Sequence, residues 1–155
     1  MTKMTGSGTA DPEQDAAMLS NTLIRRIEWG DCDPAGIVYN PNFFSFFDHG
    51  TAMLYEAAGW SKEVMLKKFG ATGAPVVETR ATFRIPCTFG EDVAITSSVV
   101  EIGRSSFKVR HELAKDGEVC VEGFETRVWT VRDPQTGRMK SAPLPQELAE
   151  RFRAG

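Results

Sequence analysis

Apolar residues recur at helical spacing over one long stretch in the first half of the chain. The positions are Phe43, Phe46, Phe47, Gly50, Leu54, Ala57 and Ala58. Steps of three and four residues bring such side chains to one face of a helix. Asn40 and Pro41 fit the cap and the first turn of that helix, and Gly59 fits its end. The pattern predicts a long apolar helix over residues 41–58, followed by a shorter amphipathic helix over 61–69.

The second half of the chain carries strand-like patterns. Alternating or β-branched runs cover residues 76–85, 92–101, 105–115 and 118–132, and an earlier run covers 22–29. The sequence D-G at 116–117 is typical of a hairpin turn. The reversal at 133–137 precedes a short strand, and a surface helix is expected over 145–153. An antiparallel sheet wrapped around the long helix is the economical way to bury its phenylalanines, so the fold class is α+β.

Length and composition indicate one globular domain. The chain has 155 residues, of which 41% are hydrophobic and 25% charged, with a net charge of −3. These values exclude a wholly disordered or fibrous chain, and a weakly acidic domain lacks the basic surface that binds nucleic acid. The apolar runs are far shorter than the roughly 20 residues of a membrane-spanning helix. We therefore expect neither a nucleic-acid nor a membrane partner.

The first 20 residues differ in composition from the rest of the chain. They are rich in Gly, Ser, Thr, Asp and Ala and lack apolar periodicity, which predicts a disordered tail over 1–20 and one domain over 21–155. They also lack the apolar run of a secretory signal. Cys32, Cys87 and Cys120 form no C-x-x-C pair. Free thiols in a reducing cytoplasm are the simplest interpretation.

Residues 28–42 join a segment rich in turn-forming and acidic residues to the start of the long helix. The segment reads E-W-G-D-C-D-P-A-G-I-V-Y-N-P-N. With Asp first, Pro second and Gly fourth, D-P-A-G at 33–36 fits a type I turn. This structural interpretation is compatible with a functional one.

The functional interpretation rests on the geometry of a helix start. Backbone N–H groups there lack intrahelical partners and lie at the positive end of the helix dipole. Pro41 has no N–H group, so the remaining donors are the amides that follow or precede it, those of Asn40, Asn42 and Phe43. A carbonyl oxygen bound there would be polarised, and the Asp33 carboxylate could attack its carbon or activate water. The combination suits acyl transfer from a thioester.

The segment G-D-C-D-P-A-G-I-V-Y-N-P-N-F, followed by F-F-D, resembles the opening of the 4-hydroxybenzoyl-CoA thioesterase family, a group with the hot-dog fold. The similarity continues in order through P-V-V at 75–77, G-R-S-S-F at 103–107, R-H at 110–111, R-V at 127–128 and G-R-M-K at 137–140. It covers about residues 22–145. It implies a hot-dog fold and an acyl-CoA thioesterase that needs no cofactor or metal, coenzyme A being part of the substrate.

The resemblance also implies roles for individual residues. Asp33 matches the catalytic carboxylate, as nucleophile or as general base, and the backbone N–H of Asn40 matches the oxyanion donor. The family typically has Tyr or His near position 40, but a backbone donor survives the change to Asn. Asp48 matches the aspartate near the ring hydroxyl of a hydroxybenzoyl substrate. A solvated or interface carboxylate is the alternative interpretation of Asp48.

A second group of residues matches the family's contacts with coenzyme A. Arg104, Ser105 and Ser106 match the loop at the CoA phosphates, and Lys140 stands where the hydroxybenzoyl enzyme has Arg. Cations and hydroxyl donors at a turn suit phosphate. Because Lys lacks the planar fork of Arg, we expect that contact to be looser. Each position could equally be an ordinary exposed loop residue.

Several functions remain open on the sequence alone. The favoured substrate is a hydroxylated aryl-CoA, and a short-chain aliphatic acyl-CoA is the alternative. An enoyl-CoA hydratase or dehydratase would need a histidine base, yet both histidines, His49 and His111, lie outside residues 28–42. His111 alternates with apolar residues and is expected on one sheet face. A non-catalytic module that binds CoA esters is the third possibility. No metal-ligand spacing and no G-x-S-x-G motif is present, so neither a metal site nor a serine hydrolase is expected.

The expected architecture also predicts an oligomer. One sheet around one helix leaves its other face partly uncovered, and Trp129, Val131 and Val128 supply apolar surface that could pair. Together with the resemblance, this predicts a homodimer, or a homotetramer built from two dimers, with sites between subunits.

Overall fold

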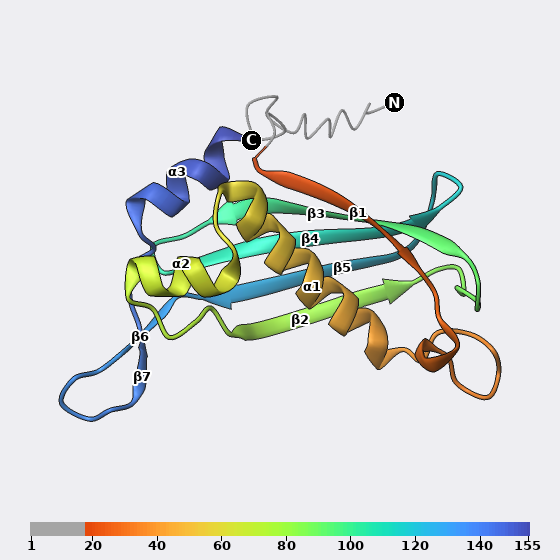
Figure 1. The fold of residues 1–155 in the computed structure, drawn as a ribbon, viewed down its shortest axis with the longest axis horizontal. Coiled ribbons are helices and arrows are strands. Elements are labelled where there is room, and N and C mark those ends of the chain that lie inside the picture. Colours follow the sequence, from red (N-terminus) through yellow and green to blue (C-terminus); the bar gives the residue numbers. More distant parts are fainter. Residues whose placement is uncertain (1–17) are drawn as a thin grey trace, which may run out of the picture.

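The computed structural model describes residues 18–155 (Figure 1). In chain order the elements are β1 (Ser20–Arg26), the 3-10 turn η1 (Trp29–Asp31), α1 (Pro41–Ala58), α2 (Lys62–Phe69), β2 (Val76–Phe83), β3 (Asp92–Ile102), β4 (Ser106–Lys115), β5 (Glu118–Val128), β6 (Thr130–Arg132), β7 (Met139–Ser141) and α3 (Gln146–Ala154). An antiparallel sheet has the strand order β1-β3-β4-β5-β2, and β6 pairs with β7 in a separate hairpin. Helix α1 crosses one face of the sheet (Figure 1). The predicted α+β architecture of sheet and central helix is confirmed.

The core beneath α1 consists of two apolar clusters with a polar layer between them. The first half of the helix contributes Phe43, Phe46 and Phe47 to one cluster, and its second half contributes Leu54 and Ala58 to the other. The polar layer contains Thr51, Ser97, His111, Glu125 and Arg127, all of them buried. Charged residues are almost never buried unless they are paired, so this layer is the unusual feature of the core.

Two turns follow the expected chemistry. The β4–β5 turn places Asp116 at φ 50° and Gly117 at φ 76°, the left-handed pair of a type I′ hairpin. Helix α1 ends at Gly59, whose φ of 120° allows its N–H to return to the carbonyl of Glu56 at 2.9 Å. Both turns were predicted from the sequence.

The N-terminal boundary differs from the prediction. Residues 1–17 of the expected tail lie outside the described residues, so for them it stays a prediction. Leu19 and Ser20 belong to the folded unit: Leu19 is buried, and its N–H donates to the carbonyl of Phe152 at 2.7 Å. Strand β1 ends at Arg26 rather than at residue 29. The N–H of Glu28 donates to Oδ2 of Asp31 at 2.9 Å, and the chain turns there into η1.

The strand predicted over 118–132 is broken at Trp129. Its N–H donates to the carbonyl of Ser105 at 2.7 Å, and its carbonyl accepts from Ala142 at 3.0 Å. The indole is 1% exposed and packs edge-on against Phe69, with ring centroids 6.1 Å apart. The prediction that Trp129 offers a surface for pairing between subunits is therefore wrong, because its own chain buries it.

None of the helices within residues 18–155 is both long and apolar enough to cross a membrane.

Candidate active site

A tight hairpin holds Asp33 in place ahead of α1. The N–H of Asp33 donates to the carbonyl of Ile37 at 2.9 Å, and the N–H of Gly36 donates to the carbonyl of Asp33 at 2.9 Å. The latter bond closes the predicted turn at 33–36. Gly36 has φ 81°, a conformation that favours glycine. The N–H of Val38 donates to Cys87 at 2.9 Å and ties the hairpin to the loop after β2.

The two aspartates of the D-C-D motif have different surroundings. Both carboxylate oxygens of Asp31 accept from Arg25, at 3.1 and 3.3 Å, and one also accepts from the N–H of Glu28 at 2.9 Å. Asp33 accepts a single bond, from the N–H of Ala35 to Oδ1 at 2.8 Å. Within residues 18–155 its Oδ2 has no hydrogen-bond partner. Asp31 is therefore occupied in holding the loop, whereas Asp33 has an oxygen available for chemistry.

Only one of the expected main-chain donors at the helix start is unused. The N–H of Asn42 donates to the backbone carbonyl of Tyr39 at 2.8 Å, and the N–H of Phe43 donates to the backbone carbonyl of Asn40 at 3.1 Å. The N–H of Asn40 has no acceptor among the residues that the structure describes. Its side chain does not cap the helix, contrary to the prediction, because Asn40 is already helical at φ −47° and ψ −43°.

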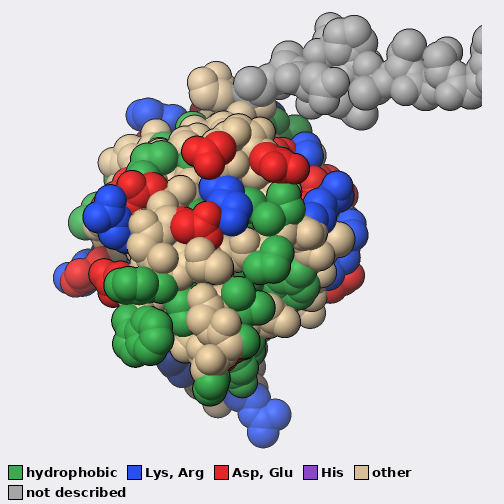
Figure 2. Space-filling view, turned by 90° about the vertical axis from the view of Figure 1, so that its right-hand side faces the viewer, with side chains coloured by type: hydrophobic (Ala, Val, Ile, Leu, Met, Phe, Trp, Pro, Cys, Tyr) green, Lys and Arg blue, Asp and Glu red, His purple; other side chains and the backbone are tan. Residues whose placement is uncertain are grey.

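An apolar cavity of about 190 Å³ opens beside this donor. It is lined by Asn40 together with Ile37, Val38, Phe43, Phe83, Arg84, Ile85, Pro86, Cys87 and Val121. Seen from this end of the molecule, acidic and basic side chains gather in the upper part and hydrophobic side chains lie mostly in the lower part (Figure 2). Apart from Arg84, the side chains that line the cavity are uncharged, so its surface suits an apolar acyl group.

Asp48 lies farther along α1 and forms an ion pair with Arg127 of β5. Its side chain is 60% exposed, yet Oδ1 accepts from Nη2 of Arg127 at 2.7 Å. Arg127 is buried, and its guanidinium donates to both oxygens of Glu125, at 2.9 and 3.2 Å, and to the carbonyl of Ala74 at 3.1 Å. The structure thus joins Asp48 to a buried ion pair on β5.

Glu125 in turn is fixed by the polar layer of the core. It accepts from the hydroxyl of Thr51 and lies 3.3 Å from Nε2 of His111, whose Nδ1 is 2.7 Å from the hydroxyl of Ser97. Burial alone would raise the pKa of Glu125, but its hydrogen bonds with His111 and Arg127 outweigh that effect and lower the pKa to about 2. The carboxylate is therefore ionised at neutral pH.

Sequence reasoning placed His111 on a sheet face, which is confirmed, but did not single out Glu125 as functional. A signal was present in the strand. In V-E-G-F-E-T-R, positions 125 and 127 follow the alternation of the buried positions 121 and 123, so both charges point inward. Charges in phase with a buried face indicate a paired, positioned group.

A groove runs between α1 and the edge strand β2. One part, of about 370 Å³, is lined by Phe44, Ser45, Asp48, Val76, Thr79, Glu125 and Arg127. Asn40, Phe44 and Asp48 are four residues apart in turn, which places them along one side of the helix. Eight residues at 1.5 Å each separate the two ends by about 12 Å. The groove therefore ends at the Asp48 carboxylate, and Asn40, which lines the separate apolar cavity, lies about two helical turns away along the same side of α1.

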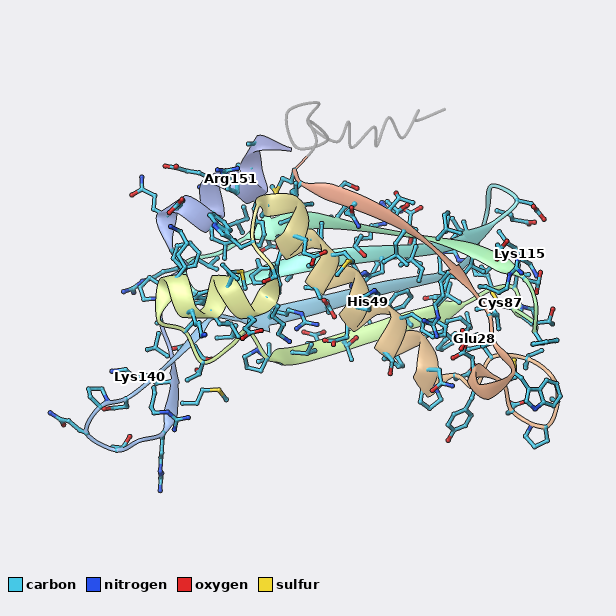
Figure 3. All side chains as sticks on the ribbon, in the orientation of Figure 1. Glu28, His49, Cys87, Lys115, Lys140 and Arg151 are labelled. Atoms are coloured by element: carbon cyan, nitrogen blue, oxygen red, sulfur yellow. The ribbon has the colours of Figure 1, made fainter. Side chains whose placement is uncertain are left out.

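The residues predicted to bind coenzyme A lie at the other end of the molecule. The N–H of Leu144 donates to the backbone carbonyl of Arg104 at 2.9 Å. This bond brings the β3–β4 loop next to the segment after β7. Arg104 and Lys140 are exposed, and Ser105 and Ser106 are half-buried. Figure 3 shows Lys140 on the β6–β7 hairpin, far from Glu28, which precedes η1 at the opposite end. One chain therefore does not bring this cluster together with Asp33.

Comparison with known proteins finds relatives of the whole folded part. The family model described as Thioesterase-like superfamily matches residues 27–152. A 4-hydroxybenzoyl-CoA thioesterase from Pseudomonas sp. is 30% identical over 139 residues, which are 84% of this chain and 96% of that protein. A 1,4-dihydroxy-2-naphthoyl-CoA hydrolase from Synechococcus elongatus is 27% identical, over 81% of this chain and 90% of its own length.

Solved structures give the same result. A variant of 4-hydroxybenzoyl CoA thioesterase, complexed with 4-hydroxybenzoyl CoA, matches with a TM-score of 0.78 and 27% identity, covering 86% of this chain and 99% of that one. A gentisyl-coenzyme A thioesterase matches with a TM-score of 0.73 and 29% identity, covering 85% and 98%. The expected hot-dog fold is confirmed by these matches.

Proposed function

Because the chain belongs to the thioesterase-like superfamily and is a thioester hydrolase with the hot-dog fold, we propose that it hydrolyses the CoA thioester of a hydroxylated aromatic acid. One observation carries the proposal. At the start of α1 a main-chain N–H without an acceptor, that of Asn40, is preceded by a loop carboxylate with an unoccupied oxygen, that of Asp33. Together the two groups can carry out thioester hydrolysis, the N–H by stabilising the oxyanion and the carboxylate as nucleophile or general base.

The proposed reaction begins with the thioester oxygen accepting the N–H of Asn40. One such donor contributes about 10²–10³ to the rate, because negative charge develops on that oxygen. If Asp33 is the nucleophile, its oxygen bonds to the carbonyl carbon, the C–S bond breaks, and water cleaves the resulting mixed anhydride. If it is the base, it takes a proton from the water that attacks the same carbon. Either route releases the free acid and coenzyme A.

The aromatic substrate class is supported by the spacing along α1. An ionised Asp48 can only accept hydrogen bonds, so it requires a donor on the substrate. The roughly 12 Å from position 40 to position 48 accommodates a carbonyl, one ring, a hydroxyl and a hydrogen bond of about 2.9 Å at each end. Phe44 lies between the two positions, where a ring can pack against it. The relatives named above act on hydroxybenzoyl, gentisyl and dihydroxynaphthoyl thioesters, which all carry such hydroxyls.

A short-chain aliphatic acyl-CoA is the second candidate substrate. It is favoured by the apolar cavity beside Asn40, whose lining includes Phe43, Phe83 and Val121. An aliphatic chain in that cavity would leave Asp48 unused.

We further propose that the working unit is at least a homodimer joined through β2. This strand is an edge of the sheet, and Val77 and Phe83 on it are 61% and 44% exposed. Such an edge is a template for pairing with another strand. A two-fold axis across antiparallel β2 strands places the Arg104 and Lys140 end of one copy beside the Asp33 end of the other. That arrangement completes the site, and two such dimers would form a tetramer.

The unpaired thiols of Cys32, Cys87 and Cys120 support a reducing, cytoplasmic location.

The substrate proposal is tested with a panel of CoA esters, followed by release of free thiol. We expect 4-hydroxybenzoyl-CoA and other hydroxyaryl esters to have the highest kcat/KM, ahead of benzoyl-CoA and of short aliphatic esters. Faster turnover of butyryl-CoA would favour the aliphatic candidate. Binding without thiol release would indicate a non-catalytic module, and loss of enoyl absorbance would indicate a hydratase.

The shared site is tested by mixing two inactive variants. Asp33→Asn and Arg104→Ala subunits, refolded together, should regain activity, because a mixed dimer contains one site with both residues intact. Each variant refolded alone is the control. No recovery in a mixture that light scattering shows to be dimeric, or a monomer at micromolar concentration, would contradict the proposal.

A further inference from the structure

Asp48 is bound unlike an ordinary surface carboxylate. In most surface ion pairs both side chains are exposed and flexible, so neither has a fixed orientation. Here the carboxylate is 60% exposed but its partner Arg127 is 5% exposed. The Asp48 carboxylate at the edge of the groove is thus ion-paired with a buried guanidinium.

Arg127 is immobilised by contacts on three sides. Nε and Nη2 form a fork on the two oxygens of Glu125, at 2.9 and 3.2 Å, while Nη1 donates to the carbonyl of Ala74 at 3.1 Å. The remaining bond of Nη2 goes to Oδ1 of Asp48 at 2.7 Å. Because the guanidinium is planar and its donors have fixed directions, this set of bonds fixes the direction from which Asp48 is held.

Glu125 is anchored by α1 itself. It accepts from the hydroxyl of Thr51, three residues from Asp48 on the same helix, and it lies 3.3 Å from Nε2 of His111. The ring of His111 is stacked on Phe47 with the centroids 4.7 Å apart. The path from Asp48 through Arg127 and Glu125 therefore returns to the helix that carries Asp48, so carboxylate and helix are braced against the sheet as one unit.

We propose that Arg127 and Glu125 are positioning residues for substrate recognition: they hold Oδ1 of Asp48 and leave its Oδ2 to accept the ring hydroxyl of the acyl group. Oδ2 has no hydrogen-bond partner within residues 18–155, and Asp48 lines the groove between α1 and β2. The inference rests on the proposed function and extends it, because it assigns the discrimination between hydroxylated and plain aryl thioesters to a buried pair that does not touch the substrate.

The inference predicts a selective loss on changing Arg127. A site built to bind a hydroxyl rejects an analogue that lacks it, so the useful quantity is kcat/KM for 4-hydroxybenzoyl-CoA divided by kcat/KM for benzoyl-CoA. Arg127→Lys keeps the positive charge but loses the fork. We expect it to lower this ratio about tenfold, mainly through a higher KM for the hydroxylated ester, while benzoyl-CoA turnover changes by less than about threefold.

Three further variants make the test specific. Asp48→Asn should lower the ratio as well, and combining it with Arg127→Lys should lower it no further, because both act through one carboxylate. Glu125→Gln keeps the shape of the side chain but releases the fork, and should lower the ratio in the same direction. Arg110→Lys is the matched control, since Arg110 pairs with Glu122 at 3.1 Å on the same sheet without contacting Asp48. It should leave the ratio unchanged.

The outcomes separate this inference from the proposed function. If the wild type releases thiol from aryl-CoA esters but Arg127→Lys and Glu125→Gln lower both rates by the same factor, the pair serves only stability and the inference is wrong while the function stands. A wild-type ratio near one would overturn it as well. If no CoA ester releases thiol, the proposed function itself fails. Circular dichroism of each variant establishes that it is folded. If Arg127→Lys is unfolded, Arg127→Gln is used in its place.

Discussion

Gly50 of α1 lies directly over Ser97 of β3, so closely that a Cβ at position 50 would overlap the Ser97 hydroxyl. The same Cβ would lie 3.3 Å from Nδ1 of His111. Glycine within a helix costs about 1 kcal/mol relative to alanine. The close contact explains why it is tolerated here, because it lets the helix approach the polar layer that fixes Glu125.

Gly50→Ala should therefore destabilise the protein, although helix propensity alone predicts the opposite sign. We expect the free energy of unfolding in urea to fall by about 1–3 kcal/mol, the usual range for overpacking. Gly30→Ala is the control, since a Cβ at position 30 would have no atom within 4 Å from any residue other than its two chain neighbours. An alanine at 50 that leaves stability equal or higher would show that the layer is looser than described.

The oxyanion role of Asn40 concerns its backbone, so two substitutions at one position test it. Asn40→Pro removes the N–H group, and the residue's φ of −47° is close to the range of proline. We expect kcat to fall about 10²–10³-fold. Asn40→Ala keeps the N–H and should retain most of the activity, because the side chain forms no cap. Equal activity of the folded Pro and Ala variants would exclude this donor.

The buried Glu125 predicts a defined loss of stability in acid. Its pKa is lowered from 4.5 to about 2, because hydrogen bonds with His111 and Arg127 outweigh the effect of burial. A carboxylate with a lowered pKa stabilises the fold above its ordinary pKa, and that contribution is lost as the pH falls from about 4.5 towards 2. The shift corresponds to roughly 3 kcal/mol.

The Glu125→Gln variant lacks the carboxylate, so it lacks this pH-dependent stabilisation. The difference in free energy of unfolding between the wild type and Glu125→Gln should therefore shrink as the pH falls from about 4.5 towards 2. Urea unfolding at pH 6, 4 and 2.5 measures the difference. Glu91, whose pKa is lowered to about 2 by hydrogen bonds from Lys115 and Thr88, is present in both proteins and cancels. A deficit that is constant with pH would mean that Glu125 is not held as an ionised partner.

The cysteines should differ in reactivity. Burial and the neighbouring Cys120 thiol raise the pKa of Cys87 to about 12, and Cys120 is fully buried. Only the thiolate reacts with a disulfide reagent, so at pH 8 the folded protein should show one fast thiol, that of the partly exposed Cys32. Cys32→Ser should remove the fast phase, and guanidinium should expose the remaining two. Two fast thiols in the folded wild type would contradict the packing around Cys87.

The periodicity of the chain was sufficient to predict α1, α2, the long strands and their turns, because those elements follow from which side chains are buried. The end of β1 and the break at Trp129 were missed, since both depend on hydrogen bonds between distant segments, such as the bond from Trp129 to Ser105. Local sequence contains no record of such partners.

The candidate site was predicted in part. The sequence singled out Asp33 and Asn40, which the structure places on consecutive segments, but it could not show that Asp31 is occupied by Arg25 while Asp33 is not. The link from Asp48 to Arg127 spans 79 positions and depends on the packing of α1 against β5. Separation of the coenzyme A cluster from Asp33 likewise becomes apparent only once the strand directions are known.

The most direct test of the account is the turnover of 4-hydroxybenzoyl-CoA by Asp33→Asn. The amide oxygen of Asn can still accept the N–H of Ala35, so the turn is kept while the carboxylate is lost. Asp116→Asn makes the same chemical change at an exposed turn and serves as the control. We predict that kcat falls about 10²–10⁴-fold in Asp33→Asn and is unchanged in Asp116→Asn. A folded Asp33→Asn enzyme that releases coenzyme A within a few-fold of the wild-type rate would contradict the account.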